Sequence, residues 1–483
     1  MKQQPQQFHQ NSAAALADPV LRSNFRGAMD FLRNKRSGIF ETDGDFDALS
    51  RRGEAIKQRC LQQLPELLEQ LEQNCTRNGI QVHWAETPAQ ANAIIETLIR
   101  KRGGKQAVKG KSMVSEEIGL NEYLAERGVD CIESDMGEFI VQLAGETPSH
   151  IIMPAIHKDA SQIAHLFAES LQDTPYTEDV DQLIGIGRQQ LRERFQHADV
   201  GITGVNFAVA ETGTLCLVEN EGNGRMCTTV PPLHIAVTGI EKVVAQLGDV
   251  PPLLSLLTRS ATGQKITTYF NMISSPRRPG EKDGPEEVHL VLLDNGRSQA
   301  FVDEELRKTL QCIRCGACMN HCPVYTRIGG HAYGTTYPGP IGKIVSPHLL
   351  GLEATQDLPT ASSLCGACEE VCPVRIPIPK LLQRLREETN RPHVLPEHMK
   401  GAGSGRKKME AFVWRTWSWV CRHPAVYHAG AALAGQLRGL FRFLPSPWKT
   451  RRTMPKPAKT TLHAALKNRP SRSATPCPQE KIS

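Results

Sequence analysis

Between Cys312 and Pro323 the chain reads Cys312-Ile-Arg-Cys315-Gly-Ala-Cys318-Met-Asn-His-Cys322-Pro323. Two residues separate each of the first three cysteines, three precede the fourth, and a proline follows it, which is the spacing of iron-sulfur ligand runs. Three thiolates on a tight turn can converge on one small cubane, while the fourth points away. Gly316 lets the backbone approach the inorganic sulfides, where N–H groups raise the reduction potential.

A shorter copy of this run follows downstream as Cys365-Gly-Ala-Cys368-Glu-Glu-Val-Cys372-Pro373, with Ser362 in the slot of the first cysteine. In two-cluster ferredoxins the fourth cysteine of each run ligates the other cluster. The sequence therefore predicts two clusters. The first is a 4Fe-4S cluster on Cys312, Cys315, Cys318 and Cys372. The second, on Cys322, Cys365 and Cys368, is 3Fe-4S or 4Fe-4S with a labile iron held by serine, water or a partner group.

A zinc site is the main alternative for clustered cysteines. Zinc favours paired CxxC units with four ligands in total, and seven cysteines in two proline-terminated runs do not match that pattern. The other cysteines outside the tail are isolated and are predicted to be small core hydrophobes: Cys60, Cys75, Cys131, Cys216 and Cys227. The fourteen cysteines come without an apolar export signal, which predicts a reducing, cytoplasmic location.

Upstream of the cysteines, short apolar strands alternate with helical stretches, which is typical of an α/β domain with a parallel or mixed sheet. We expect one amphipathic helix over residues 47–75, then strands in IQVHW, near Ala107, in VDCIES and in SHIIMPAI, and further strands in NFAVAETGTLCLVEN, HIAVTG and HLVLLD. The segment FVDEELRKTLQ is predicted to be a helix leading into the cysteines. Ile184-Gly185-Ile186-Gly187 lacks the third glycine of a nucleotide loop and is predicted to be helical.

The chain end is electrostatically distinct. Residues 401–483 hold 16 Lys and Arg against two Glu, a net charge of +14, so the preceding 400 residues sum to −8. Four tryptophans interleave with arginines there: Trp414, Trp417, Trp419 and Trp448, beside Arg415, Arg422, Arg438 and Arg442. This composition fits docking to a partner subunit, peripheral contact with a membrane, or a disordered end, and nucleic acid is not expected. No run is apolar and long enough to span a bilayer.

Three groups of stretches resemble the lactate utilisation protein B family. They are the interval IGGHAYGTTYPGPIG with LPTASSLCGACEEVCPVRIPI, the upstream VKGKSMVSEEIGLNEYL and ESDMGEFIVQL, and GITGVNFAVAETGTLCLVENEGNGRM. The resemblance implies four regions: an N-terminal helical region at 1–64, an α/β LUD domain at 65–297, an α-helical dicluster ferredoxin domain at 298–392, and a linker with a basic tail at 393–483. LUD domains of that family resemble the isomerase and CoA-transferase type of fold, whose sites bind small anionic ligands.

The resemblance also places candidate ligand residues in the LUD segment: Lys109, Lys111, Ser112, Glu117 and Asn121 in its first half, with Thr203, Glu211, Thr212 and Gly213 in its second. Of these, Lys111 and Glu211 are the candidates for a catalytic role. The alternatives are that the KGKS loop is only solvated and that Glu211-Thr212-Gly213 is an ordinary hairpin turn.

The expected function is electron transfer for a multi-subunit system that oxidises L-lactate to pyruvate, with two iron-sulfur clusters as the cofactors. No flavin or nicotinamide motif is visible, so the two-electron step would occur in a partner or in the LUD site. In a second hypothesis the LUD domain is itself the catalytic unit of a 2-hydroxy-acid dehydrogenase. In a third hypothesis the LUD domain only binds a ligand or a partner. In a fourth, the chain is the iron-sulfur subunit of a related dehydrogenase such as glycolate oxidase.

Overall fold

The computed structural model describes residues 3–42, 45–390, 405–440 and 457–467. The chain divides into two compact units, Met1–Gly401 and Ala402–Ser483. The first unit holds both sheets and all seven clustered cysteines. The boundaries at 64/65 and 297/298 stay predictions, because Met1–Gly401 forms a single compact unit.

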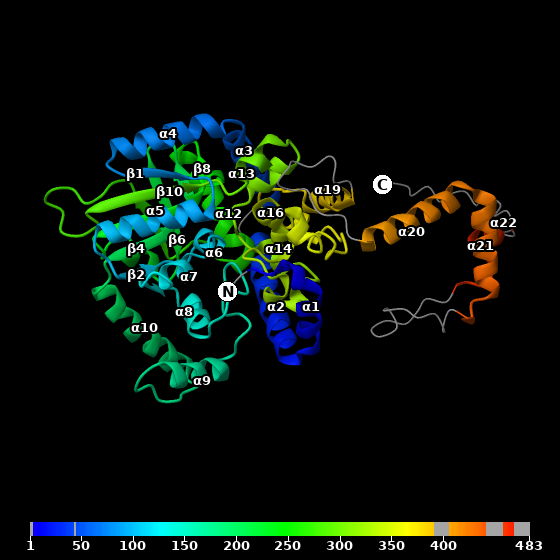
Figure 1. The fold of residues 1–483 in the computed structure, drawn as a ribbon, viewed down its shortest axis with the longest axis horizontal. Coiled ribbons are helices and arrows are strands. Elements are labelled where there is room, and N and C mark those ends of the chain that lie inside the picture. The colour runs from blue at the N-terminus through cyan, green and yellow to red at the C-terminus, as the bar shows by residue number, and fades with distance from the viewer. Residues whose placement is uncertain (1–2, 43–44, 391–404, 441–456, 468–483) are drawn as a thin grey trace, which may run out of the picture. The chain divides into compact units, whose positions relative to one another are not determined.

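A six-stranded parallel sheet forms the core of one half of the first unit, and the cysteine segment with the N-terminal helices lies beside it (Figure 1). Its strands lie in the order β1-β10-β7-β4-β2-β3, and every neighbouring pair is parallel. A second sheet has the order β8-β5-β6-β9, with β5 parallel to β8 and antiparallel to β6. The strands are β1 (Gln81–Ala85), β2 (Gln106–Lys109), β3 (Asp130–Glu133), β4 (Val200–Gly204), β5 (Phe207–Val209), β6 (Thr214–Glu219), β7 (Leu233–Gly239), β8 (Val243–Val244), β9 (Tyr269–Ile273) and β10 (Glu287–Leu293). The predicted α/β class with a parallel sheet is confirmed.

Helices cover both faces of the parallel sheet, which is why the whole of β7 is buried. One face packs against α5 (Pro88–Lys101), α6 (Met113–Glu117) and α7 (Leu120–Ala125). On the other face Val108 packs among side chains of α8 (Met136–Leu143), α9 (Ala160–Ser170) and α10 (Val180–Gln196). Ile184–Gly187 lies inside α10, as predicted. Short helical elements α11 (Asn223–Cys227), η2 (Ile240–Lys242) and η3 (Leu247–Asp249) and the longer α12 (Val250–Thr262) complete this region.

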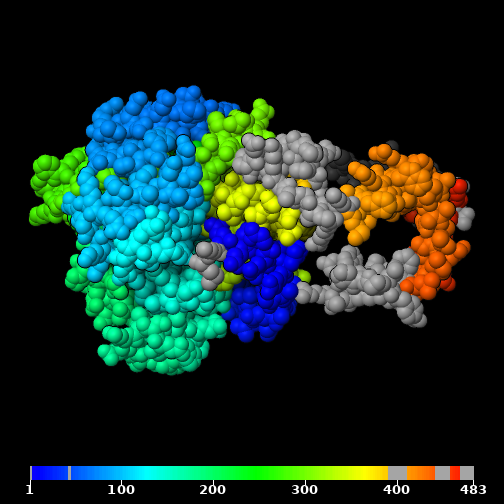
Figure 2. Space-filling model, in the orientation of Figure 1, coloured from blue at the N-terminus to red at the C-terminus, as the bar shows by residue number. Residues whose placement is uncertain are grey.

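The N-terminal helices pack on the cysteine-bearing segment. Phe25 of α2 (Pro19–Thr42) meets the Tyr325 ring edge-on at 5.6 Å, and Arg33 Nε donates to Asn320 O at 2.6 Å. In the space-filling view these residues, coloured blue, lie directly against the segment coloured yellow (Figure 2). The first elements are η1 (Pro5–Gln7) and α1 (Phe8–Ala17). The two ends of the first unit therefore share one hydrophobic core.

Three local predictions were wrong. Residues 47–75 form two helices, α3 (Phe46–Gln62) and α4 (Leu64–Arg77), because Pro65 has no N–H to donate and fits only the first turn of a new helix. Residues 149–156 form turns and bends instead of a strand. Their polar atoms face the cysteine segment: Tyr325 Oη donates to Ser149 O at 2.7 Å. Residues 301–311 are split between α13 (Arg297–Val302) and the 3-10 helix η4 (Leu306–Gln311).

Short helices carry the cysteine segment: α14 (Ala317–Asn320), α15 (Tyr325–Ile328), η5 (His331–Tyr333), α16 (Gly339–Leu350), α17 (Leu352–Thr355), α18 (Ala367–Glu370) and α19 (Ile378–Asn390). The second unit contains α20 (Gly405–Arg422), α21 (Pro424–Gln436) and α22 (Leu462–Lys467). Trp414, Trp417 and Trp419 of α20 are exposed, whereas Arg442 and Trp448 lie outside the described residues. Within the described ranges, no helix has the length and apolar character needed to cross a bilayer.

Candidate iron-sulfur site and the adjoining cavity

The two cysteine runs adopt the same backbone. In the first, Arg314 and Gly316 flank Cys315 with φ of +62° and +85°, and α14 follows. In the second, Leu364 and Gly366 flank Cys365 with φ of +55° and +86°, and α18 follows. A positive φ on the non-glycine residues is rare and strained, so its occurrence at the matching position in both runs indicates a turn built for a purpose.

Equivalent atoms of the two runs form equivalent hydrogen bonds. The N–H of Arg314 donates to Cys312 Sγ at 3.3 Å, and the N–H of Leu364 donates to Ser362 Oγ at 3.1 Å. Ser362 therefore makes the same contact with the turn as the first cysteine of the other run. A hydroxyl is a much weaker iron ligand than a thiolate, so this slot is the weak point of the second run.

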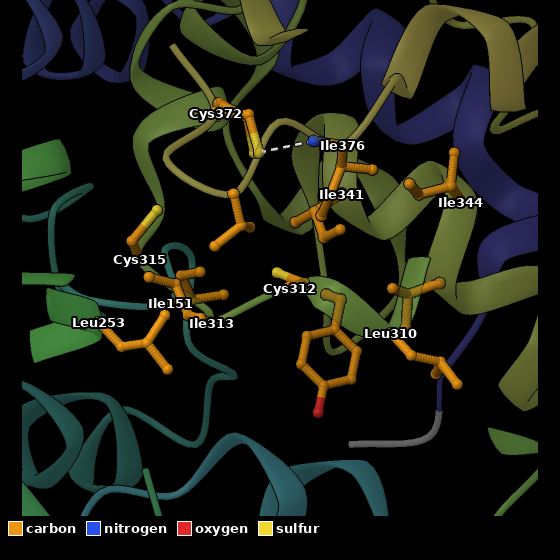
Figure 3. Close-up of a cluster of buried hydrophobic side chains, with 14 of the residues drawn as sticks. Ile151, Leu253, Leu310, Cys312, Ile313, Cys315, Ile341, Ile344, Cys372 and Ile376 are labelled. Atoms are coloured by element: carbon orange, nitrogen blue, oxygen red, sulfur yellow. Dashed lines mark hydrogen bonds between the residues drawn. The ribbon is translucent and has the colours of Figure 1, made fainter. Parts of the chain in front are cut away.

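The fold brings the seven thiols into one neighbourhood, within which two groups can be distinguished. Cys372 of the second run lies near Cys312, Cys315 and Cys318, and Cys368 lies near Cys322 and Cys365. Cys368 also lies near Cys318 and Cys372, so the two groups adjoin. Figure 3 shows the sulfur atoms of Cys312, Cys315 and Cys372 pointing toward a common space lined by isoleucine and leucine side chains. Thiols of both runs therefore lie next to one another, which is compatible with crossed ligation.

The chemistry of these thiols fits metal ligation. Burial raises the pKa of Cys372 and of Cys368 to about 12, so without a metal these thiols hold their protons at neutral pH. Bound iron displaces such protons and supplies the positive charge that a buried thiolate needs. The N–H of Ile376 donates to Cys372 Sγ at 3.3 Å, the kind of contact that stabilises a cluster's sulfur ligands (Figure 3). When bound, an iron-sulfur cluster takes up and releases single electrons.

The two groups differ in their access to solvent. Every cysteine of the first group is buried, whereas Cys365 of the second group is exposed and Cys368 is half-buried. The buried ammonium of Lys343 lies 4.0 Å from Cys322 Sγ and donates to the carbonyl of Ala361. The first group is thus enclosed, and the second reaches the surface.

A buried charge network adjoins the first group. Arg297 donates to both carboxylate oxygens of Glu117, at 2.8 and 2.9 Å, and to Glu241 Oε2 at 2.6 Å. Arg314 lies 3.4 Å from the other oxygen of Glu241. Burial would raise the pKa of Glu241, but Arg297 and Arg314 outweigh it and lower the pKa to about 2. Glu241 is therefore ionised and ties the cysteine loop to the α/β segment.

A cavity of about 300 Å³ lies beside this network, at the carboxyl ends of the central strands. Parallel α/β sheets commonly bind ligands at this edge. Residues directly after β2, β4 and β7 line the cavity, including Lys111, Asn206 and Lys242, and the cysteine loop contributes Arg314. Burial and the nearby Arg314 lower the pKa of Lys242 to about 8. The cavity therefore joins the α/β segment to the first cysteine group.

The structure separates the candidate residues of the first half of the LUD segment. Lys111 and Ser112 line the cavity. Lys109 is fully buried, with its Nζ 2.6 Å from Glu133 and 3.0 Å from Glu116, and the same Glu133 oxygen accepts from Asn121 Nδ2 at 2.6 Å. Glu117 belongs to the Arg297 network. Lys109, Glu117 and Asn121 therefore have partners within the protein and do not line the cavity.

Of the candidates of the second half, Thr203 lies beside Gly110 at the end of the neighbouring strand, whereas Glu211, Thr212 and Gly213 belong to a separate turn. Thr203 is buried and shares a hydrogen bond of 2.8 Å with His234. Glu211, Thr212 and Gly213 form the turn between β5 and β6, and Asn74 and Asn78 of α4 and its C-terminal end donate to carbonyls of that turn. Glu211 itself accepts from Leu247 N at 3.0 Å and does not line the cavity. The hairpin alternative thus describes the local structure, and the proposed roles of Lys111 and Glu211 remain hypotheses.

Sequence reasoning missed Lys242 and Arg314. Arg314 stands between two cluster cysteines, so its side chain could have been suspected of serving the same site. Lys242 carries no motif, and only the three-dimensional structure places it in the cavity. The isolated Cys60, Cys75, Cys131, Cys216 and Cys227 are buried, as predicted.

Known protein families match the sequence in the same regions as the α/β segment and the cysteine segment. Residues 68–293 match the LUD domain, residues 308–376 match a 4Fe-4S dicluster domain, and residues 384–471 match the C-terminal region of lactate utilisation protein B. The lactate utilization protein B of Bacillus subtilis is 44% identical over 381 residues, covering 79% of each chain. That of an Exiguobacterium species is 41% identical, covering 96% of this chain and 98% of its own. The electron transport protein YkgF of Escherichia coli is 43% identical, covering 86% of this chain and 85% of its own. The chain belongs to the lactate utilisation protein B family, as an iron-sulfur protein of electron transport and lactate utilisation.

Proposed function

We propose that the chain is the electron-transfer subunit of a system that oxidises L-lactate to pyruvate. The observation that carries this proposal is the placement of the two thiol groups. The first is enclosed beside the cavity of the α/β segment, and the second reaches the surface at Cys365. Electrons released by lactate oxidation would enter at the first group and leave through the second.

The proposal includes two clusters with crossed ligands. A 4Fe-4S cluster is held by Cys312, Cys315, Cys318 and Cys372. The second is held by Cys322, Cys365 and Cys368. Ser362 occupies the slot of the missing first cysteine, so this cluster is 3Fe-4S or 4Fe-4S with a labile iron. The mixed grouping of the thiols and the matching hydrogen bonds of Cys312 and Ser362 support this assignment.

Replacing one fourth cysteine at a time tests the wiring. EPR spectra of anaerobically prepared Cys372→Ala should lose the signal of the enclosed site, and those of Cys322→Ala should lose the signal of the surface site. Iron and sulfide analysis on the same samples gives the cluster number. If Cys372→Ala instead lost only the surface signal, crossed ligation would be wrong.

Turnover by the isolated chain tests the functional role. With L-lactate and an artificial acceptor, an electron-transfer subunit gives no turnover until the other subunits of the system are added. The cavity beside the first thiol group favours a second candidate function, in which the LUD domain is itself the catalytic unit of a 2-hydroxy-acid dehydrogenase. Lactate-dependent acceptor reduction by the chain alone would support that candidate and contradict the role of a pure relay.

Other subunits of the lactate-oxidising system are the proposed partners. Cys365 lies beside exposed Glu369 and Glu370, so the surface group presents an acidic face on which a basic partner surface could dock. In the tail, the exposed tryptophans of α20 lie among basic residues, which supports docking to a partner or peripheral contact with the inner face of the membrane. The free thiols of the described cysteines support a cytoplasmic location.

A further inference from the structure

Lys242 carries a buried positive charge without a partner. It is the last residue of η2, its side chain is only 7% exposed, and it lines the cavity. Within the described part of the chain, its Nζ has neither a hydrogen bond nor an ion pair. The nearby Glu241 carboxylate favours this ammonium, but Arg297 and Arg314 already pair with that carboxylate, so Lys242 can bind a further anion from the cavity.

The carboxylates that line the cavity already have donors. Asp135 accepts from Glu138 N at 3.1 Å, Glu219 accepts from Gly224 N at 2.6 Å, and Glu221 accepts from Met136 N at 3.1 Å. None of them forms an ion pair with Lys242. The cavity therefore has unused donors at its cationic side, and a bound anion would satisfy them.

Two further cations point to the same conclusion. Lys111 lines the cavity and uses one N–H for Ile152 O at 2.6 Å, which leaves the others available. Arg314 lies with its guanidinium 4.5 Å from the centre of the Tyr337 ring, and both side chains line the cavity. An arginine fork and two ammonium groups match the two oxygens of a carboxylate.

Arg314 connects this cationic side to the first thiol group. Its backbone N–H donates to Cys312 Sγ at 3.3 Å, and its side chain lies near enough to Cys312 for the two charges to interact. An anion bound by the Arg314 side chain would therefore lie close to the cluster that Cys312 and Cys315 are proposed to hold. In a buried setting of low dielectric such a charge is felt strongly.

We propose that the cavity binds a small carboxylate through Lys111, Lys242 and Arg314, and that its negative charge disfavours reduction of the first cluster. The second half of this statement rests on the cluster assignment above, and the first half does not. Linkage then requires the reverse effect as well: the oxidised protein binds the carboxylate more tightly than the reduced protein. The cavity would thus report on the redox state of the enclosed cluster.

Calorimetric titration of the anaerobic, oxidised full-length protein tests the binding. Pyruvate and L-lactate serve as probes, with lactamide as an uncharged analogue of the same size and inorganic phosphate as a different oxyanion. We expect a carboxylate to bind, lactamide not to bind, and Lys242→Met to weaken binding at least tenfold. Lys105→Met is the matched control, because Lys105 is exposed at the opposite end of β2 and should leave binding unchanged.

Loss of folding in the variants can be distinguished from loss of binding by measuring the melting temperature. Removing an unpaired buried charge should keep or raise the melting temperature of Lys242→Met, and Lys111→Met offers a second variant at a half-buried position. Equal binding of lactamide, binding of phosphate alone, or unchanged affinity in both variants would overturn the carboxylate site.

A redox titration followed by EPR tests the coupling. Saturating pyruvate should shift the potential of the enclosed cluster to more negative values in the native protein and not in Lys242→Met. Dithionite-reduced protein should bind pyruvate several-fold more weakly than oxidised protein. If binding holds but the potential does not move, the coupling is wrong. If binding fails while the assembled system still oxidises lactate through both clusters, only this inference falls, and the proposed function stands.

Discussion

Replacing Arg297 with methionine should strongly destabilise the first unit. The guanidinium is 2% exposed and bridges Glu117 and Glu241 with three charge-assisted hydrogen bonds of 2.6 to 2.9 Å. Methionine fills a similar volume but leaves two buried carboxylates without their main counter-ion. Tyr337 and Asn295 still donate to Glu117, and Arg314 remains beside Glu241.

Breaking a buried ion pair by removing one partner costs about 3–5 kcal/mol, and the remaining donors keep the expected loss near the middle of that range, at about 4 kcal/mol. For a unit of roughly 400 residues the unfolding entropy is about 0.8 kcal/mol per kelvin. The melting temperature should therefore fall by about 5 °C.

Differential scanning calorimetry of the anaerobic protein measures this loss. Arg277→Met is the matched control, because Arg277 pairs with Glu286 at 3.1 Å on the surface, where both side chains are at least one third exposed. Exposed pairs contribute about 0–1 kcal/mol, so the control should shift the melting temperature by about 1 °C or less. Equal shifts in the two variants would show that the Arg297 network contributes no more than a surface pair.

Three further predictions concern the sites. Ser362→Cys should convert the surface site to a stable 4Fe-4S cluster, seen as loss of any three-iron EPR signal and slower loss of iron in air; unchanged spectra would exclude Ser362 as the ligand slot. Burial and the nearby Asp135 raise the pKa of Glu221 to about 6. Protonation of Glu221 between pH 7 and pH 5 removes a negative charge from the cavity, so the affinity for pyruvate should rise about fivefold. In Glu221→Gln, calorimetry should find the same affinity at both pH values. Deleting residues 402–483 should leave iron content and spectra intact, since all seven cysteines lie in Met1–Gly401, while pull-down of the other subunits should weaken; loss of iron on truncation would place the tail in the cluster fold.

Short-range patterns predicted much of this architecture. The alternation of apolar strands and helical stretches in residues 80–134 predicted β1 to β3 and the helices between them, because burial in a parallel sheet imposes that pattern locally. The ligand spacing predicted the turns around Gly316 and Gly366, because geometry fixes which residues can stand between thiolates. The strand expected in residues 149–156 was wrong. Ile151 is buried in the same core as the cysteine segment, and His150 bonds to Asn320, 170 residues later, a contact that no local pattern encodes.

The cavity shows the same limit. Lys111 could be singled out from its loop, but Lys242 and Arg314 become neighbours only when η2 and the cysteine loop pack together. The sequence made Glu211 a catalytic candidate together with Lys111, but hydrogen bonds from Asn74 and Asn78 hold the Glu211 turn against α4. Gly213 explains this placement: at φ of +65°, an added Cβ would lie 2.7 Å from the backbone of Asn74 and Cys75, so the turn is built for close contact with that helix.

The enclosure of the first thiol group bears on how the protein matures. Ser50 of α3 donates to Cys372 O at 3.4 Å, and α2 and α3 come from the opposite end of the unit to close over the cysteine segment. On the proposed ligand assignment, iron and sulfide would reach the enclosed site more readily before these N-terminal helices dock, whereas the exposed Cys365 leaves the other site open to later loading and repair. Maturation of the enclosed site would then favour a chain whose first 62 residues are still undocked.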